Sequence, residues 1–260
     1  MDDYYIKDRE LAAYFEAQWF DKLSWHDKSA LSDFAAAPVA ENFIQLPFFQ
    51  QSAELITSSL RAHAVAAENL LEIGPSLGRT CYELITANNS LKKITVIEPS
   101  QILLKHFKNI ITSGGQHEFP AITNFRQLGQ VTFDANPVTR ACSNIDFSFI
   151  ESPIDAPLSL EAFDVTVCLN VLDQCGSPLA IVETLQRNTR CGGLVALSCT
   201  YQWDKKHVKD FMQTRSDISD YFSPRWEKVA DANFEYRFRT NERYASTFLS
   251  HLVIFKKHDA

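Results

Sequence analysis

Two acidic residues and two glycines have the types and spacing expected of a small-molecule binding site. In LLEIGPSLGRTCYELI, residues 70–85, an apolar run ends in Glu72, and Gly74 and Gly78 follow before amphipathic spacing resumes. A glycine after a strand lets the backbone approach a ligand closely, and the helix that follows presents unpaired N–H groups with a partial positive charge. A second acid, Glu98, comes at the end of the apolar run in ITVIEPS. We therefore expect a ligand at the ends of two successive strands.

The order of acid and glycine separates two classes of cofactor. The dinucleotide fingerprint G-x-G-x-x-G is absent from this stretch. Instead Glu72 precedes the glycines, where a carboxylate suits the cationic amino group of a methionine moiety and would repel a pyrophosphate. Glu98 can accept both hydroxyls of a ribose. The pair predicts S-adenosylmethionine (SAM) as the cofactor; the competing interpretation is a strand–helix–strand turn with two incidental surface acids.

The elements that position these residues alternate between strand and helix. Strand-like runs lie at 70–74, 92–100, 145–152, 163–172 and 193–200, and helical periodicity lies at 78–88, 101–112 and 178–190, with 191–193 ending the last helix. Such alternation implies a parallel sheet. Two strand runs within 234–257 have no helix between them and predict an antiparallel hairpin that closes the sheet. Within 113–144, SGGQHEFP is expected to be a loop, and the rest could be an inserted strand pair.

The first 68 residues carry helical patterns and no strand signal. Apolar spacing predicts helices at 8–20 and 52–67, the second with Ser52 as its N-cap, and a segment with Pro47 separates them. We therefore expect an N-terminal helical cap at 1–68 and a SAM-binding core at 69–260.

Composition limits the class of protein. The 260 residues are 45% hydrophobic, enough for one large domain with a cap, and the net charge of −7 with scattered basic residues disfavours a nucleic-acid binder. No apolar stretch is long enough to span a membrane, and the polar N-terminus is unlike a secretory signal. Six cysteines without a C-x-x-C pair and seven dispersed histidines predict reduced thiols and no metal site. We expect a cytoplasmic protein without a membrane partner.

The acid–glycine pattern resembles that of the class I SAM-dependent methyltransferases, from about residue 70 to the C-terminus. The family pattern is acid-x-Gly-x-Gly-x-Gly, and this chain has Ser76 at the middle glycine. The resemblance implies a Rossmann-like α/β fold: a mostly parallel seven-stranded sheet with a C-terminal antiparallel hairpin and the helical cap. It also places the adenine near 152–154, with Glu151, Ser152 or Asp155 as the partner of its amine. The implied cofactor-binding residues are Glu72, Gly74, Pro75, Ser76, Gly78, Arg79, Glu98, Pro99, Ser152, Pro153, Ile154, Leu169 and Asn170.

A narrower resemblance is to the methyltransferase domain of ovothiol synthases. It rests on GPSLGRTCYEL, on LNVLDQCGSPLAIVETLQRNTRCGGLVALSCTYQW, on the tail RTNERYASTFLSHLVIFKK and on the leading YYIKDRELAAYFEAQWF. It implies a stand-alone N-methyltransferase for a small amino-acid-like acceptor, the imidazole nitrogen of 5-thiohistidine or its selenium analogue. This chain departs from the family where N-L-I-D-R-L becomes NVLDQC at 170–175 and where S-P-Y-T-W becomes SCTYQW at 198–203.

Methyl transfer to an imidazole demands little chemistry from the protein. The acceptor must approach the methyl group in line with water excluded, and a carboxylate or phenol can orient or remove the other ring proton. Asp173 and Tyr201 are the candidates for this catalytic role. The alternative for Asp173 is an N-cap or loop acid without a catalytic role, and the alternative for Tyr201 is ordinary packing. The predicted substrate-binding residues are these two together with Asn170, Trp203 as an aromatic wall, Arg239 and Arg243 as partners of the acceptor carboxylate, and Tyr5 as part of a lid.

Other functions stay open. The enzymatic alternative is methylation of another small amine, thiol or hydroxyl metabolite, and the non-enzymatic one is a SAM-binding protein without turnover. A nicotinamide oxidoreductase is disfavoured by the missing fingerprint.

Overall fold

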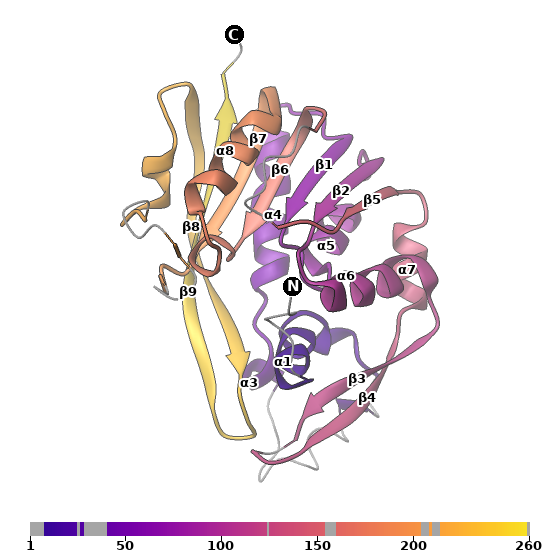
Figure 1. Ribbon diagram of the computed structural model, residues 1–260. Helices are drawn as coiled ribbons and strands as arrows, with labels where there is room; N and C mark the ends of the chain where they lie inside the picture. Colours follow the sequence, from indigo (N-terminus) through magenta and orange to yellow (C-terminus); the bar gives the residue numbers. More distant parts are fainter. Residues whose placement is uncertain are drawn as a thin grey trace.

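A seven-stranded mixed sheet organises the molecule. The computed structural model describes residues 8–24, 27–28, 41–123, 125–153, 160–203, 208–209 and 214–258. The strand order is β5-β2-β1-β6-β7-β9-β8, and the five strands from β5 to β7 are parallel while β9 is antiparallel to both its neighbours (Figure 1). The bounds are β1 (Asn69–Ile73), β2 (Lys93–Ile97), β5 (Asp146–Ile150), β6 (Phe163–Leu169), β7 (Thr189–Cys199), β8 (Trp226–Arg239) and β9 (Ala245–Lys257). The predicted Rossmann-like sheet with a closing hairpin is confirmed.

The central strands are apolar on both faces because helices cover both. Alternate side chains of one strand enter different cores: Ile94 and Val96 of β2 pack with the first, and Ile97 packs with the second. The first core includes residues of α4 (Phe48–Ala62), α5 (Arg79–Ala87) and α6 (Gln101–Lys108), and the second includes residues of α8 (Pro178–Asn188). The sheet is therefore buried on both sides, and its carboxyl edge is the place left for a ligand.

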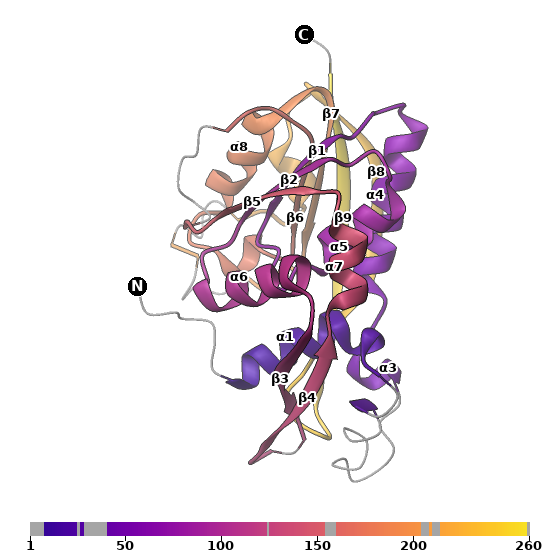
Figure 2. The ribbon, with the colours of Figure 1, turned by 90° about the vertical axis from the view of Figure 1, so that its right-hand side faces the viewer.

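A second, two-stranded sheet and the first helix lie beyond that edge. β3 (Gln116–Ile122) and β4 (Leu128–Asp134) pair antiparallel, and α1 (Asp8–Trp19) packs against them (Figure 2). The ring of Phe15 stacks on Phe119 with 4.1 Å between centroids. The described shorter elements are η1 (Phe20–Lys22), α3 (Glu41–Ile44), η2 (Asn109–Ser113), α7 (Asn136–Cys142), η3 (Leu172–Gln174) and η5 (Ile218–Tyr221).

Some predicted boundaries are wrong. The strand pair within 113–144 is present, but β3 begins inside the stretch predicted as loop, and α7 follows β4. Ser52 lies inside α4 and is not its N-cap, since the N-cap residue is Pro47. Proline suits the start of a helix because it has no backbone N–H to be left unpaired there. Residues 191–193 belong to β7 and do not terminate a helix, since α8 already ends at Asn188.

No helix in the described part of the chain combines the length and the apolar character needed to cross a membrane.

Candidate functional site

A cavity of about 490 Å³ lies at the carboxyl ends of β1, β2, β6 and β7. One part, which we call the glycine-turn half, is lined from β1, β2 and the turns after them. The opposite part, the aromatic half, is lined from α1, α4 and the β8–β9 hairpin. Of the residues predicted from sequence, the cavity is lined by Glu72, Gly74, Pro75, Ser76, Glu98, Pro99, Pro153, Leu169, Asn170 and Asp173.

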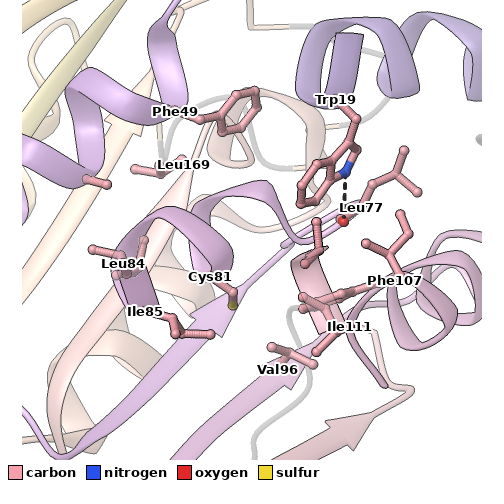
Figure 3. Close-up of a cluster of buried hydrophobic side chains, with 14 of the residues drawn as sticks. Trp19, Phe49, Leu77, Cys81, Leu84, Ile85, Val96, Phe107, Ile111 and Leu169 are labelled. Atoms are coloured by element: carbon pink, nitrogen blue, oxygen red, sulfur yellow. Dashed lines mark hydrogen bonds between the residues drawn. The ribbon is translucent and has the colours of Figure 1, made fainter. Parts of the chain in front are cut away.

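The turn after β1 requires its glycines. Gly74 and Gly78 have φ of +69° and +82°, and a Cβ on Gly74 would lie 2.5 Å from a methyl carbon of Val171. A Cβ on Gly78 would lie 2.2 Å from the ring of Phe107, in the buried cluster of Figure 3. Gly78 does not line the cavity: it lets the turn pack on Phe107 and begins α5.

The carbonyl of this turn is tied to the first helix. The indole Nε1–H of Trp19 donates to the carbonyl oxygen of Leu77 at 3.2 Å, as the dashed line in Figure 3 shows. Trp19 is fully buried. The position of the glycine turn therefore depends on α1 as well as on the sheet.

Glu98 is held by two backbone donors at the end of β2. It is 5% exposed, and its Oε2 accepts from the N–H of Ser76 at 3.1 Å while its Oε1 accepts from the N–H of Ser100 at 3.0 Å. The carboxylate thus links the glycine turn to the next strand, and it faces the cavity. A fixed carboxylate in this place suits the two hydroxyls of a ribose.

Glu72 is a buried acid with an altered pKa. It is 2% exposed and accepts a hydrogen bond from the thiol of Cys81 at 2.7 Å. Burial raises the pKa of Glu72 to about 7, against the opposing hydrogen bonds from Cys81 and Thr80. A cationic ligand in the cavity would favour the ionised form.

Asp173 lies in η3, shortly after β6, and lines the cavity. It is 1% exposed, and its Oδ2 accepts from the hydroxyl of Thr200 at 2.5 Å and from the N–H of Gln202 at 3.2 Å. Thr200 and Gln202 also line the cavity. The structure therefore brings the end of β6 and the end of β7 together around one carboxylate.

Tyr201 and Trp203 lie outside this lining. Tyr201 has a φ of +59°, and it does not line the cavity, whereas its neighbours Thr200 and Gln202 do. Its phenol lies 2.5 Å from Nδ1 of His251 and accepts from the N–H of Ile218 at 3.1 Å, and burial raises its pKa to about 12. Trp203 packs against Tyr201. The structure therefore does not bring the predicted phenol and aromatic wall into the cavity lining, and their roles toward a substrate stay predictions.

Two predicted arginines are engaged in buried ion pairs. Arg79 is fully buried and contacts both carboxylate oxygens of Asp21 at 2.6 and 2.7 Å. Arg239 is 2% exposed, and it contacts Glu16 at 2.6 and 2.7 Å and the carbonyl oxygen of Ile122 at 2.6 Å. These guanidinium groups join η1 and α1 to the core, and neither residue lines the cavity. The structure therefore places both side chains on protein carboxylates, and the ligand-binding roles predicted for them stay predictions.

Four further predicted residues do not appear in the described cavity lining. Arg243 is exposed in the β8–β9 turn and does not line the cavity, and neither does Ser152. The predictions for Tyr5 and Ile154 lie outside the described residues.

Aromatic side chains that the sequence analysis did not assign to the site form the aromatic half. They come from both ends of the chain, and they are Tyr14, Phe48, Phe49, Tyr236, Phe238 and Phe248. The alternation in FEYRF, residues 234–238, is the signal that could have found the strand members, since it puts Tyr236 and Phe238 on one face. None of the described lining residues is a lysine, arginine or histidine, whereas Glu72, Glu98 and Asp173 are acids.

Three solved methyltransferase structures share this fold at low sequence identity. N-methyltransferase NodS from Bradyrhizobium japonicum WM9, in complex with S-adenosyl-L-homocysteine (SAH), is 16% identical over 90% of this chain and 99% of that chain, with a TM-score of 0.54. A putative RNA methyltransferase from Pyrococcus horikoshii is 8% identical over 94% and 98%, with a TM-score of 0.53. A putative methyltransferase from Bacillus halodurans C-125 is 12% identical over 78% and 99%, with a TM-score of 0.50. No protein-family model and no curated protein matches the sequence. The comparisons show that this chain shares the Rossmann-like fold of these structures.

Proposed function

We propose that the protein is a SAM-dependent methyltransferase for a small acceptor. The observation that carries the proposal is the pair of buried carboxylates, Glu72 and Glu98, that line one cavity on either side of the glycine turn. The fold supports it, and the SAH bound to NodS shows that a protein with this fold binds the demethylated cofactor.

The charges of the cavity fit SAM. SAM carries a sulfonium, an ammonium and one carboxylate group, so its net charge is positive, and the described lining offers three acidic side chains without a basic one. The pyrophosphate of a dinucleotide would instead need cations or a free nest of backbone N–H groups. The hydroxyl of Ser76 and the amide nitrogen of Asn170 are buried without a hydrogen-bond partner in the described part of the chain, so a ligand with polar atoms can satisfy both.

Each residue of the glycine-turn half then has a binding task. When bound, SAM supplies an electrophilic methyl group on a sulfonium. Glu98 accepts the ribose hydroxyls, Glu72 offsets the positive charge of the methionine amino group, and Gly74 allows the backbone to come close. Pro99 and Pro153 provide apolar surface beside the adenine.

The acceptor occupies the aromatic half, beside Asp173. The carboxylate of Asp173, which accepts hydrogen bonds from Thr200 and Gln202, orients or removes a proton of the acceptor. The aromatic rings of this half exclude water. Support for the finer assignment, a nitrogen of 5-thiohistidine or its selenium analogue, comes from the sequence resemblance. Because Arg239 is engaged by Glu16, the described residues supply no arginine for the acceptor carboxylate.

The experiment has two stages. Titration calorimetry of the purified protein with SAH should give a defined affinity, and mass spectrometry should then follow SAM with 5-thiohistidine, its selenium analogue and histidine in parallel. A gain of one methyl group on a chalcogen-bearing ring supports both the reaction and the acceptor. Binding without product would favour another acceptor or a SAM-binding protein without turnover, and absence of binding would contradict the proposal.

A further inference from the structure

Asn170 has a buried polar atom that is costly unless a ligand uses it. Its φ is +55°, in the left-handed region, which asparagine adopts more readily than most residues other than glycine. Its side-chain Nδ2 is buried, with no hydrogen-bond partner among the described residues. A buried donor without a partner costs free energy because its hydrogen bonds to water are lost on folding. Since Asn170 lines the cavity, a bound molecule can be the missing partner.

The orientation of this amide is fixed by two serines. Ser250 Oγ lies 2.5 Å and Ser198 Oγ lies 3.0 Å from Oδ1 of Asn170. A separation of 2.5 Å suits an O–H···O hydrogen bond and is too short for N–H···O, which places the amide oxygen there. The Ser198 hydroxyl also accepts from the backbone N–H of Asn170 at 3.1 Å, so its own hydrogen is free to donate to Oδ1. Nδ2 is therefore the atom left for a molecule in the cavity.

The two serines connect Asn170 to the aromatic half. Ser198 is in β7 and Ser250 is in β9, and both are fully buried. Residues 246, 248 and 250 alternate on one face of β9, and Ser246 and Phe248 line the cavity. In the sheet order, β7 and β9 lie on one side of β6, while β1 and β2, with Glu72 and Glu98, lie on the other.

We propose that Asn170 is the hydrogen-bond donor that holds the methyl acceptor, and that Ser198 and Ser250 are positioning residues that fix its amide. This inference rests on the proposed function, since it divides the same cavity between cofactor and acceptor. The group it recognises is a nitrogen or oxygen with an available lone pair, other than the atom that takes the methyl group, because donation to the attacking atom would occupy its lone pair. Asn170 then sets which acceptor atom faces the methyl group.

A matched pair of probes tests the donor on the SAH complex. Pyridine and benzene have the same ring size, but only pyridine has a lone pair for Nδ2. We expect pyridine to shift the side-chain NH₂ signals of Asn170 in a ¹⁵N spectrum and to bind about fivefold more tightly than benzene. The signals are assigned by their loss in Asn170→Asp, which keeps the contacts of Oδ1 with both serines and tolerates a positive φ. In this variant the preference for pyridine should disappear.

The positioning role has its own variant and control. Ser250→Ala should reduce the preference for pyridine while the affinity for SAH stays unchanged. Thr247→Ala, in the same strand and exposed, should alter neither. Equal binding of the two probes by the unmodified protein would overturn the inference. Asn170 signals that move with SAH alone, and not with pyridine, would assign the donor to the cofactor and also overturn it. Failure of the protein to bind SAH would contradict the proposed function, and this inference with it.

Discussion

The two halves of the cavity are assembled in opposite ways. The glycine-turn half comes from residues 72–76 and 98–100, where adjacent parallel strands end side by side and Glu98 accepts from the N–H of Ser76. The aromatic half takes Tyr14 and Phe48 from the start of the chain and Phe248 from its end. The first half depends on local turn geometry, and the second depends on long-range contacts. We therefore expect them to fail separately when perturbed.

The largest effect should come from the buried ion pair between Arg239 of β8 and Glu16 of α1, which joins two of the elements that line the aromatic half. Arg239→Met removes the cation that contacts Glu16 and the carbonyl oxygen of Ile122, and it leaves the Glu16 carboxylate buried. The free energy of unfolding should fall by about 3–5 kcal/mol, as denaturant titration would measure. Arg243→Met, in the exposed turn of the same hairpin, is the matched control and should change stability little. Equal losses in the two variants would show that α1 does not depend on this pair.

The next effect separates the halves by ligand affinity. Glu98→Ala removes the acceptor proposed for two ribose hydroxyls, each hydrogen bond to a charged group being worth about 1.5–3 kcal/mol. The affinity for SAH should fall by at least about 100-fold in calorimetry, while the fold keeps its circular dichroism spectrum. Glu161→Ala, an exposed acid on the edge of the molecule, should leave the affinity unchanged. If Glu98→Ala kept its affinity for SAH, the proposal that Glu98 binds the ribose would be wrong.

The pH dependence of binding should come from the glycine-turn half. Because the pKa of Glu72 is raised to about 7, free Glu72 is partly protonated at neutral pH, and a cationic ligand favours its ionised form. The affinity for SAM should rise with pH up to about 7 and then level off, by at most about tenfold per pH unit. In Glu72→Gln the pH dependence that comes from Glu72 should be absent. Any dependence that remains then belongs to other groups, such as the amino group of SAM. An identical pH profile in the variant would exclude Glu72 as the linked group.

The same acid should also affect stability without a ligand. A pKa raised in the folded state means that the folded protein binds more protons than the unfolded chain between pH 4.5 and about 7. The free energy of unfolding should therefore decrease as pH rises through this window, on the order of 3 kcal/mol from this group. Thermal unfolding at several pH values, with Glu72→Gln as the comparison, measures this contribution of Glu72. If the unmodified protein gained stability relative to Glu72→Gln as the pH rose from 4.5 to about 7, the prediction would have the wrong sign.

The sequence predicts the glycine-turn half because its signals are local. Glu72, Gly74 and Ser76 lie within five residues, and the parallel register of β1 and β2 brings Glu98 beside them. Asp173 was found for a similar reason, since it follows a strand of the same sheet. The seven-stranded topology follows from the same alternation of strand and helix.

The sequence is less informative where the direction of a side chain depends on distant partners. Arg79 immediately follows the glycine turn, yet its guanidinium contacts Asp21 of the N-terminal segment and does not line the cavity. Tyr201 has neighbours on both sides that line the cavity, but its own phenol contacts His251 in β9. Neither Asp21 nor His251 is close in sequence to its partner, so no local pattern could have predicted these contacts.

The smallest effect tests whether strain in the glycine-turn half serves binding. Ser76 has a φ of +54° and a buried hydroxyl without a partner among the described residues, so Ser76→Gly removes strain and none of the hydrogen bonds described for the ligand-free protein. The free energy of unfolding should rise by about 0.5–1 kcal/mol, while the stabilisation by added SAH should decrease because the ligand loses a hydroxyl partner. Ala64→Gly is the matched control: Ala64 has a φ of +50°, is exposed and does not line the cavity. It should gain similar stability with an unchanged response to SAH. If both variants respond to SAH alike, the serine at this turn contributes nothing to the ligand, and glycine would have served as well.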